Sequence, residues 1–174
     1  TTNRTIAIVG RPNVGKSALF NRLAGKRISI VHDEPGVTRD RIIASCNLSS
    51  SPFSLIDTGG IGSNPDDSFN TIIKQEVDIA LESAELILFV VDGTEGQTPV
   101  DQEIASQLRK AEKDIFLIVN KIDEESKIKL VDDFSSMGFN HTFATSAAHN
   151  FGIKELADNV SKTLPDCSTT TSSN

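Results

Sequence analysis

The sequence predicts an α/β domain of three layers, in which helices cover both faces of a mostly parallel six-stranded sheet with one antiparallel edge strand. Continuous apolar runs, such as residues 86–91 and 115–119, are typical of strands that are buried on both faces. Segments with apolar residues at helical spacing, such as residues 68–82, alternate with these runs. That alternation is typical of a parallel sheet with helices on both sides. The chain of 174 residues is long enough for one domain with a sizeable core, which we expect over residues 1–165.

Turn residues divide the first half of the chain into short elements. Gly25 ends a helix-forming run, because glycine readily adopts the backbone conformation found just after a helix. Residues 26–39 lack a clear period and contain Pro35-Gly36, so they are predicted to form a long loop, and long loops in compact domains are usually functional. These boundaries place strands at residues 5–9, 41–48 and 53–56, the last two as a hairpin, and helices at residues 16–24 and 68–82.

The second half of the chain repeats the alternation of buried strand and helix. Thr98 is suited to cap a helix whose first residue is Pro99, since proline lacks only an N–H that would be unpaired there. Pro165 closes the last helix, and residues 166–174 are rich in Ser and Thr, which predicts a linker or a disordered tail. Strands are expected at residues 86–91, 115–119 and 141–145, and helices at 99–112, within 125–137 and at 153–164.

A glycine-rich stretch between the first strand and the first helix carries the strongest motif. It reads Gly10-Arg11-Pro12-Asn13-Val14-Gly15-Lys16-Ser17 and fits G-x-x-x-x-G-K-[ST], the phosphate-binding P-loop. The glycines let backbone N–H groups point inward at phosphate oxygens, and the start of the helix adds further N–H groups. Lys16 can reach the outer phosphates and the Ser17 hydroxyl can hold magnesium. The motif therefore predicts a nucleoside triphosphate, without naming the base.

Further polar clusters follow the ends of other predicted strands, where parallel sheets bind ligands. Asp57 ends one strand and precedes Thr58-Gly59-Gly60. A carboxylate there can hold magnesium through water, and the Gly60 N–H can reach the third phosphate. Loss of that phosphate would release the loop, so it is a candidate switch. The alternative is that Asp57 only caps a turn.

The segment Asn120-Lys121-Ile122-Asp123 indicates which base is bound. The Asp123 carboxylate can accept two hydrogen bonds, from the ring N–H and the exocyclic amine of guanine, and adenine offers no such pair. The Lys121 stem can lie over the base, and Asn120 can tie this loop to the P-loop. A backbone N–H of Thr145-Ser146-Ala147 can meet the guanine carbonyl. This pattern argues against an ATP-using kinase or ATPase.

Charge and composition limit the remaining possibilities. The net charge of −7 argues against nonspecific nucleic-acid binding by the whole domain. Residues 1–41 nevertheless hold eight basic and three acidic side chains, which suits a polyphosphate ligand. Arg22, Lys26 and Arg27 either face RNA or belong to a solvated helix surface. Because no signal peptide and no long apolar run are found, we expect a cytoplasmic protein that does not contact membranes.

Together these motifs resemble those of the TrmE–Era–Era-like GTPases, which are Ras-like. More narrowly, the sequence resembles the N-terminal G domain of the Der (EngA) family, bacterial GTPases with two G domains in tandem. The likeness extends over roughly residues 4–165. It rests on Gly-Arg-Pro-Asn-Val-Gly-Lys-Ser at 10–17, Pro35-Gly36-Val37-Thr38-Arg39-Asp40, Asp57-Thr58-Gly59-Gly60-Ile61, Asn120-Lys121-Ile122-Asp123 and Ser146-Ala147.

The resemblance implies roles that the residues alone do not show. It implies that Thr38 ligates magnesium when the third phosphate is present, and that Asn13 helps to coordinate potassium. It also implies a role in assembly of the large ribosomal subunit. Family members carry a second G domain and a KH-like domain, so we expect this chain to be a fragment of a longer protein.

Ile61 bears on how GTP would be hydrolysed to GDP and phosphate. Ras-type enzymes use a glutamine after the aspartate–glycine motif to orient the attacking water, and isoleucine has no donor or acceptor with which to do so. The sequence identifies no catalytic side chain, and we expect the Gly60 backbone and Lys16 to contribute. Potassium near Asn13 can supply positive charge, which predicts slow hydrolysis stimulated by potassium. The alternative is a GTP-controlled interaction module with negligible turnover.

Overall fold

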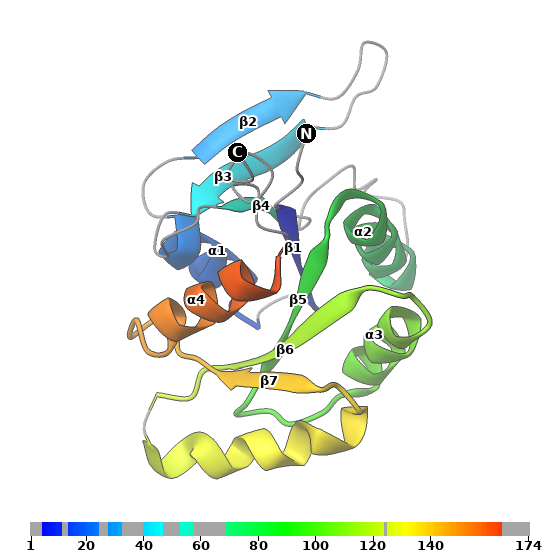
Figure 1. The fold of residues 1–174 in the computed structure, drawn as a ribbon. Coiled ribbons are helices and arrows are strands. Elements are labelled where there is room, and N and C mark those ends of the chain that lie inside the picture. The colour runs from blue at the N-terminus through cyan, green and yellow to red at the C-terminus, as the bar shows by residue number, and fades with distance from the viewer. Residues whose placement is uncertain are drawn as a thin grey trace, which may run out of the picture.

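The computed structural model describes residues 5–11, 14–24, 28–32, 40–46, 53–57, 69–123 and 125–164. They form one seven-stranded sheet in the order β2-β3-β4-β1-β5-β6-β7 (Figure 1). Five neighbouring strands, from β4 to β7, are parallel, and β2 and β3 extend the sheet on one side as antiparallel strands. The strands are β1 (Thr5–Val9), β2 (Ile28–His32), β3 (Asp40–Cys46), β4 (Phe53–Asp57), β5 (Leu86–Asp92), β6 (Asp114–Asn120) and β7 (His141–Ala144).

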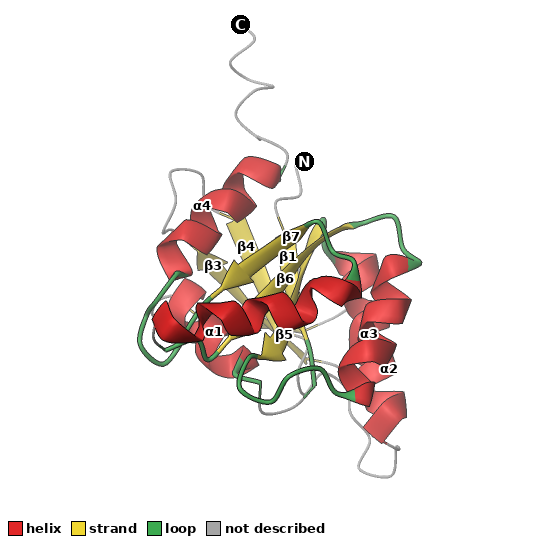
Figure 2. Ribbon diagram, turned by 90° about the horizontal axis from the view of Figure 1, so that it is seen from below, coloured by secondary structure: helices red, strands yellow, loops and turns green. Residues whose placement is uncertain are grey.

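Helices cover both faces of the sheet, which confirms the predicted three layers. On one face α1 and α4 pack together, and on the other lie α2 and α3 (Figure 2). The helices are α1 (Lys16–Ala24), α2 (Phe69–Ser83), α3 (Pro99–Arg109) and α4 (Ile153–Thr163), with a 3₁₀ helix η1 (Glu125–Met137) between β6 and β7. Among the described residues, none of these helices has the length and apolar character that crossing a membrane requires.

Alternation along the central strands creates two separate cores. All seven residues of β5 are buried, and its side chains point to the two faces in turn. Leu86, Leu88 and Val90 pack with α1 and α4, whereas Ile87 and Phe89 pack with α2 and α3. The predicted continuous apolar runs are therefore strands that contact helices on both sides.

One prediction about the sheet was wrong. Residues 26–39 were expected to be a loop, but Ile28–His32 forms β2, so the sheet has seven strands and two of them are antiparallel. The segment Ile28-Ser29-Ile30-Val31-His32 is too short for a clear period, yet its β-branched residues suit a strand. Pairing with β3 satisfies backbone groups that would otherwise face solvent at the edge of the sheet.

The other element predictions agree with the structure to within a few residues. The hairpin of β3 and β4 is present, and Thr98 caps α3 with reciprocal hydrogen bonds to Asp101. Helix α3 ends at Arg109 instead of about residue 112, because Ala111 donates to the Leu108 carbonyl in a tighter turn. The predicted tail at 166–174 lies outside the described residues.

Candidate functional site

The predicted site residues gather at one edge of the sheet. Because β1, β4, β5, β6 and β7 are parallel, their C-terminal ends meet along this edge. The P-loop follows β1, Asp57 ends β4, Asp92 ends β5, and Asn120 ends β6 opposite Asp92. Open α/β sheets bind ligands at this edge.

Two P-loop glycines lie where a side chain would not fit. Gly10 has φ +154°, and a Cβ on it would come 2.5 Å from the carbonyl oxygen of Val90. Gly15 has φ +98°, and a Cβ on it would come 2.1 Å from Nδ2 of Asn120. The loop is thus packed directly against β5 and β6, which explains why glycine is required at both positions.

Asn120 connects the two halves of the site. Its side chain is buried, and Nδ2 donates to the carbonyl of Val14 in the P-loop at 2.9 Å. Its Oδ1 accepts from Oγ1 of Thr145 and from the backbone N–H of Ala147, both at 3.1 Å. The predicted tie between this loop and the P-loop is therefore present, and it extends to the loop after β7.

Asp123 lies beside that same loop. Its Oδ1 accepts a hydrogen bond from the Ser146 hydroxyl at 2.7 Å. The Asp123 side chain is 35% exposed, so the carboxylate also faces outward, and His149 Nε2 lies 3.8 Å from it. A partly exposed carboxylate held by a neighbouring hydroxyl is a preorganised acceptor for an incoming pair of N–H donors.

Lys121 adopts a left-handed backbone conformation with φ 68° and pairs with Asp92. Its Nζ lies 3.1 Å from the Asp92 carboxylate, and its side chain is 41% exposed. Burial alone raises the pKa of Asp92, but hydrogen bonds from Thr94 and Lys121 outweigh it and bring that pKa below its ordinary value. The pair links the ends of β5 and β6.

The structure gives Lys16 a partner that sequence reasoning missed. Its Nζ lies 3.3 Å from Oε1 of Glu76 on α2, and both side chains are largely buried. A signal was present in the sequence, because Glu76 interrupts the apolar stripe formed by Ile73, Val77 and Ala80 on this helix. A carboxylate in such a stripe is costly unless it is paired.

Arg11 also has partners that were not anticipated. Its guanidinium contacts Glu95 and lies 3.3 Å from Oδ1 of Asp101 at the start of α3. Burial raises the pKa of Asp101 above its ordinary value, although hydrogen bonds from Thr98 and the charge of Arg11 oppose the shift. The Arg11 side chain thus joins the P-loop to α3, and the prediction that the loop's backbone at Arg11 binds phosphate stays a prediction.

Two of the residues that were predicted to hold magnesium, Ser17 and Asp57, lie in the described part of the chain. Asp57 pairs in register with Ile8, two residues before the P-loop, and Ser17 lies in the first turn of α1. Hydroxyl and carboxylate oxygens are the ligands that magnesium prefers. Ser17 and Asp57 would hold magnesium, which would supply positive charge to neutralise the phosphates.

Several predicted residues lie outside the part of the chain that the structure describes. For Asp57 only the backbone is described, and the switch and potassium predictions stay predictions. The residues outside are Pro12, Asn13, Thr38, Thr58, Gly59, Gly60 and Ile61.

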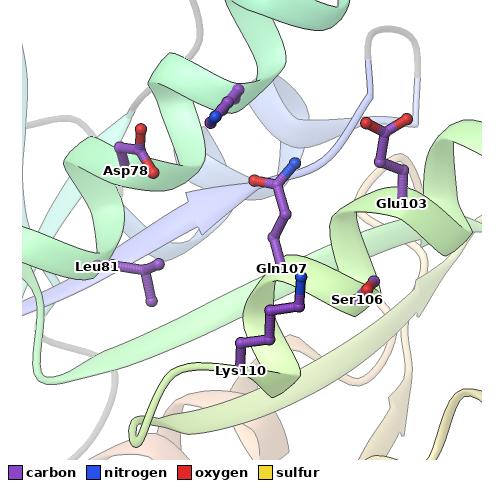
Figure 3. A pocket seen from close by; sticks show the side chains of 7 residues that line it. Asp78, Leu81, Glu103, Ser106, Gln107 and Lys110 are labelled. Atoms are coloured by element: carbon purple, nitrogen blue, oxygen red, sulfur yellow. The ribbon is translucent and has the colours of Figure 1, made fainter.

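A separate groove lies between α2 and α3. Asp78 and Leu81 of α2 face Glu103 and Gln107 of α3, and Lys110 just after α3, across it (Figure 3). None of the predicted site residues lines this groove. The groove and the sheet edge are therefore distinct surfaces.

Comparisons with known proteins agree with the geometry of the sheet edge. The family model described as "50S ribosome-binding GTPase" matches residues 5–121. GTPase Der of Akkermansia muciniphila is 51% identical over 156 residues, 90% of this chain and 34% of that protein. GTPase Der of Geotalea daltonii is 47% identical over 161 residues, 92% of this chain and 36% of that protein. This chain thus spans about a third of the length of these two relatives.

A solved structure adds a three-dimensional comparison. A point variant of Era from Aquifex aeolicus, bound to GDP and AlF4⁻, superimposes with a TM-score of 0.75 and 31% sequence identity. The likeness covers 95% of this chain and 58% of that one. The fold of this chain is thus shared with a structure that holds a guanine nucleotide.

Proposed function

Because the chain belongs to the 50S ribosome-binding GTPase family, we propose that it is a molecular switch that binds GTP and hydrolyses it to GDP and phosphate. One observation supports this most directly. Asn120 joins the P-loop carbonyl of Val14 to Thr145 and Ala147. A phosphate-binding segment and a base-binding segment are thereby held in one geometry, as a nucleotide that spans both requires.

The phosphate half of the proposed site uses the P-loop and its neighbours. Backbone N–H groups of residues 10–17 and the ammonium of Lys16 would hold the phosphates. Ser17, Asp57 through water and Thr38 would hold magnesium, which neutralises charge on the phosphates. Thr58, Gly59 and Gly60 would form the switch segment, with the Gly60 N–H donating to the third phosphate.

The base half of the proposed site uses Asp123, Lys121 and the loop after β7. Asp123 would accept from the ring N–H and the exocyclic amine of guanine, while a backbone N–H near Ser146 and Ala147 meets the carbonyl. The bond from the Ser146 hydroxyl orients the Asp123 carboxylate. The Lys121 stem would cover the face of the base.

Catalysis is proposed to work without a water-orienting glutamine, since Ile61 occupies that position. Positive charge from Lys16 and a donor from the Gly60 backbone would stabilise the transition state. Potassium held by Asn13 would add to this charge, and this part of the proposal rests on the sequence alone. A module that binds GTP with negligible turnover is the second candidate, and Ile61 is the observation that favours it.

The cellular role is part of the same proposal. The family description names 50S ribosome binding, and the two Der relatives are about two and a half times as long as this chain. We infer that the domain acts within a longer cytoplasmic protein, next to a second G domain and a KH-like domain, in assembly of the large ribosomal subunit.

Substitution of Asp123 tests the central claim about the base. Asp123→Asn replaces an acceptor with an amide that can donate, so affinity for GDP should fall by about a hundredfold while affinity for xanthosine diphosphate rises. Calorimetric titration with both nucleotides measures this exchange. The base assignment is wrong if the variant binds GDP as tightly as the original chain does.

A further inference from the structure

Arg22 on α1 reaches a loop that is distant in the sequence. Its Nε donates to the backbone carbonyl of Ala147 at 2.7 Å, and its terminal nitrogen donates to that of Ala148 at 3.1 Å. These carbonyls lie between β7 and α4, and Figure 1 shows α1 and α4 side by side. The sequence left Arg22 as either an RNA-facing charge or a solvated one. The structure shows it exposed, with two of its donor groups bonded to backbone carbonyls.

Hydrogen bonds hold the two peptide units on either side of Ala147. The N–H of Ala147 donates to Oδ1 of Asn120, and the carbonyl of the same residue accepts from Arg22. Ala147 is buried, whereas Ala148 is exposed. The loop after β7 is therefore tied to the P-loop and to α1 by two independent links, one through Asn120 in the interior and one through Arg22 at the surface.

Such a clamp matters because a hydrogen bond weakens steeply when its angle changes. In the proposed site a backbone N–H of this loop meets the guanine carbonyl. The Ala147 N–H is bonded to Asn120, but the Ala148 N–H lies in the same rigid peptide plane as the Ala147 carbonyl that Arg22 holds. Rotation of this peptide would turn the Ala148 N–H away from the base. A planar guanidinium that bonds two successive carbonyls opposes this rotation better than a single donor would.

We propose that Arg22 is a positioning residue for guanine recognition, which orients the backbone N–H of Ala148 toward the carbonyl at position 6 of the base. The inference rests on the proposed guanine-nucleotide site. Arg22 touches no nucleotide itself, and acts through Ala147 and Ala148.

The test compares GDP with 2-aminopurine riboside diphosphate, which keeps the exocyclic amine but lacks both the carbonyl at position 6 and the ring N–H beside it. The dissociation constant of the 2-aminopurine compound divided by that of GDP reports what these two groups contribute together. Asp123 would accept from the ring N–H in every variant, so a change in this ratio on substitution of Arg22 reports the carbonyl. Arg22→Ala should reduce the ratio by about tenfold, because the misdirected donor no longer favours GDP.

Two further variants separate positioning from general damage. Arg109 also lies in the last turn of its helix and donates to a backbone carbonyl, that of Met137, but α3 ends at the opposite edge of the sheet. Arg109→Ala should therefore leave the ratio unchanged, whatever it does to stability. Arg22→Lys keeps the charge and one donor group, so its ratio should fall between those of the original chain and Arg22→Ala.

The possible outcomes are distinct. If Arg22→Ala weakens binding of both diphosphates by the same factor, or of neither, Arg22 does not orient the loop and the inference is overturned. If the original chain itself binds no GDP, the proposed function fails first. Titration also gives the fraction of protein that is competent to bind, so partial unfolding is not mistaken for weaker affinity.

Discussion

The ammonium of Lys16 lies 3.3 Å from the carboxylate of Glu76, and this pair joins the P-loop to α2. Both side chains are largely buried, at 11% and 9% exposure, so water screens the pair only weakly. Phosphate oxygens would compete with Glu76 for the same ammonium, and a carboxylate near them is repelled. Helix α2 is thus paired with the Lys16 ammonium, which is proposed to bind the phosphates.

Glu76→Gln should strengthen nucleotide binding for this reason. The neutral amide neither holds Lys16 as firmly nor repels phosphate, so affinity for GDP should rise by about threefold to tenfold. The nucleotide-free variant should lose about 1–2 kcal/mol of unfolding free energy, because a mostly buried ammonium loses its counter-ion. Titration calorimetry and urea denaturation measure the two effects, with the exposed Glu82→Gln on the same helix as the control. Unchanged or weaker binding would contradict competition between Glu76 and phosphate.

Asn120→Ala should destabilise the fold as well as the site. The change leaves the Val14 carbonyl, the Thr145 hydroxyl and the Ala147 N–H without their partner. Each buried polar group left unpaired costs about 1–3 kcal/mol, so a loss of about 3 kcal/mol or more is expected in chemical denaturation. Asn120→Asp is the informative companion, because it keeps the acceptor and loses the donor to Val14. If both variants have the same unfolding free energy as the original chain, the Asn120 hydrogen bonds do not stabilise the fold.

Gly15→Ala should disrupt the packing of the P-loop on β6. The added Cβ would lie 2.1 Å from Nδ2 of Asn120, at a φ of +98° that side chains avoid. Stability should fall by about 2–4 kcal/mol, and binding of GDP should be lost with it. Gly96→Ala is the matched control, since Gly96 has φ +76° and no described atom within 4 Å of its Cβ. For Gly96→Ala only backbone strain should lower the stability, by about 1 kcal/mol.

Asp101 should give the fold a measurable dependence on pH. Its pKa in the folded chain is raised above 3.8, so the folded state binds this proton more tightly than the unfolded state does. Its stabilising contribution is full below pH 3.8 and is lost as the pH rises through the raised pKa. Relative to Asp101→Asn, the original chain should therefore lose unfolding free energy as the pH rises from 3.8 through the raised pKa. Urea denaturation of both proteins at several pH values measures this. If the pKa is not raised, the difference in unfolding free energy between the two proteins will not change with pH.

Hydrolysis should be faster in potassium than in sodium. The expectation follows from Asn13 in the P-loop and from Ile61 in place of a water-orienting glutamine. Single-turnover rates in the two salts at equal ionic strength measure it, and Asn13→Ala should remove most of the difference. Equal rates in potassium and sodium would exclude this route, and no measurable rate in either would favour the binding module.

The local motifs could be read from the sequence because their chemistry depends on neighbours in the chain. The P-loop, Asp57 and residues 120–123 each follow an apolar run, and parallel strands bring the ends of such runs to one edge. The continuous apolar run of β5 predicted a strand that is buried on both faces, and every residue of β5 is buried. The fold class, the order of most elements and the expected base therefore came from the sequence by itself.

Tertiary structure decided which side chains meet. Glu76 is 60 residues from Lys16, and Ala147 is 125 residues from Arg22, so no local pattern joins these pairs. These pairs meet because α1 and α2 pack on opposite faces of the sheet. Each helix brings a charged side chain to the sheet edge where the candidate site lies. Strand β2 was missed for a related reason, since a five-residue segment becomes a strand only when β3 supplies the hydrogen bonds. Long-range pairing depends on packing, and packing is a property of the whole chain.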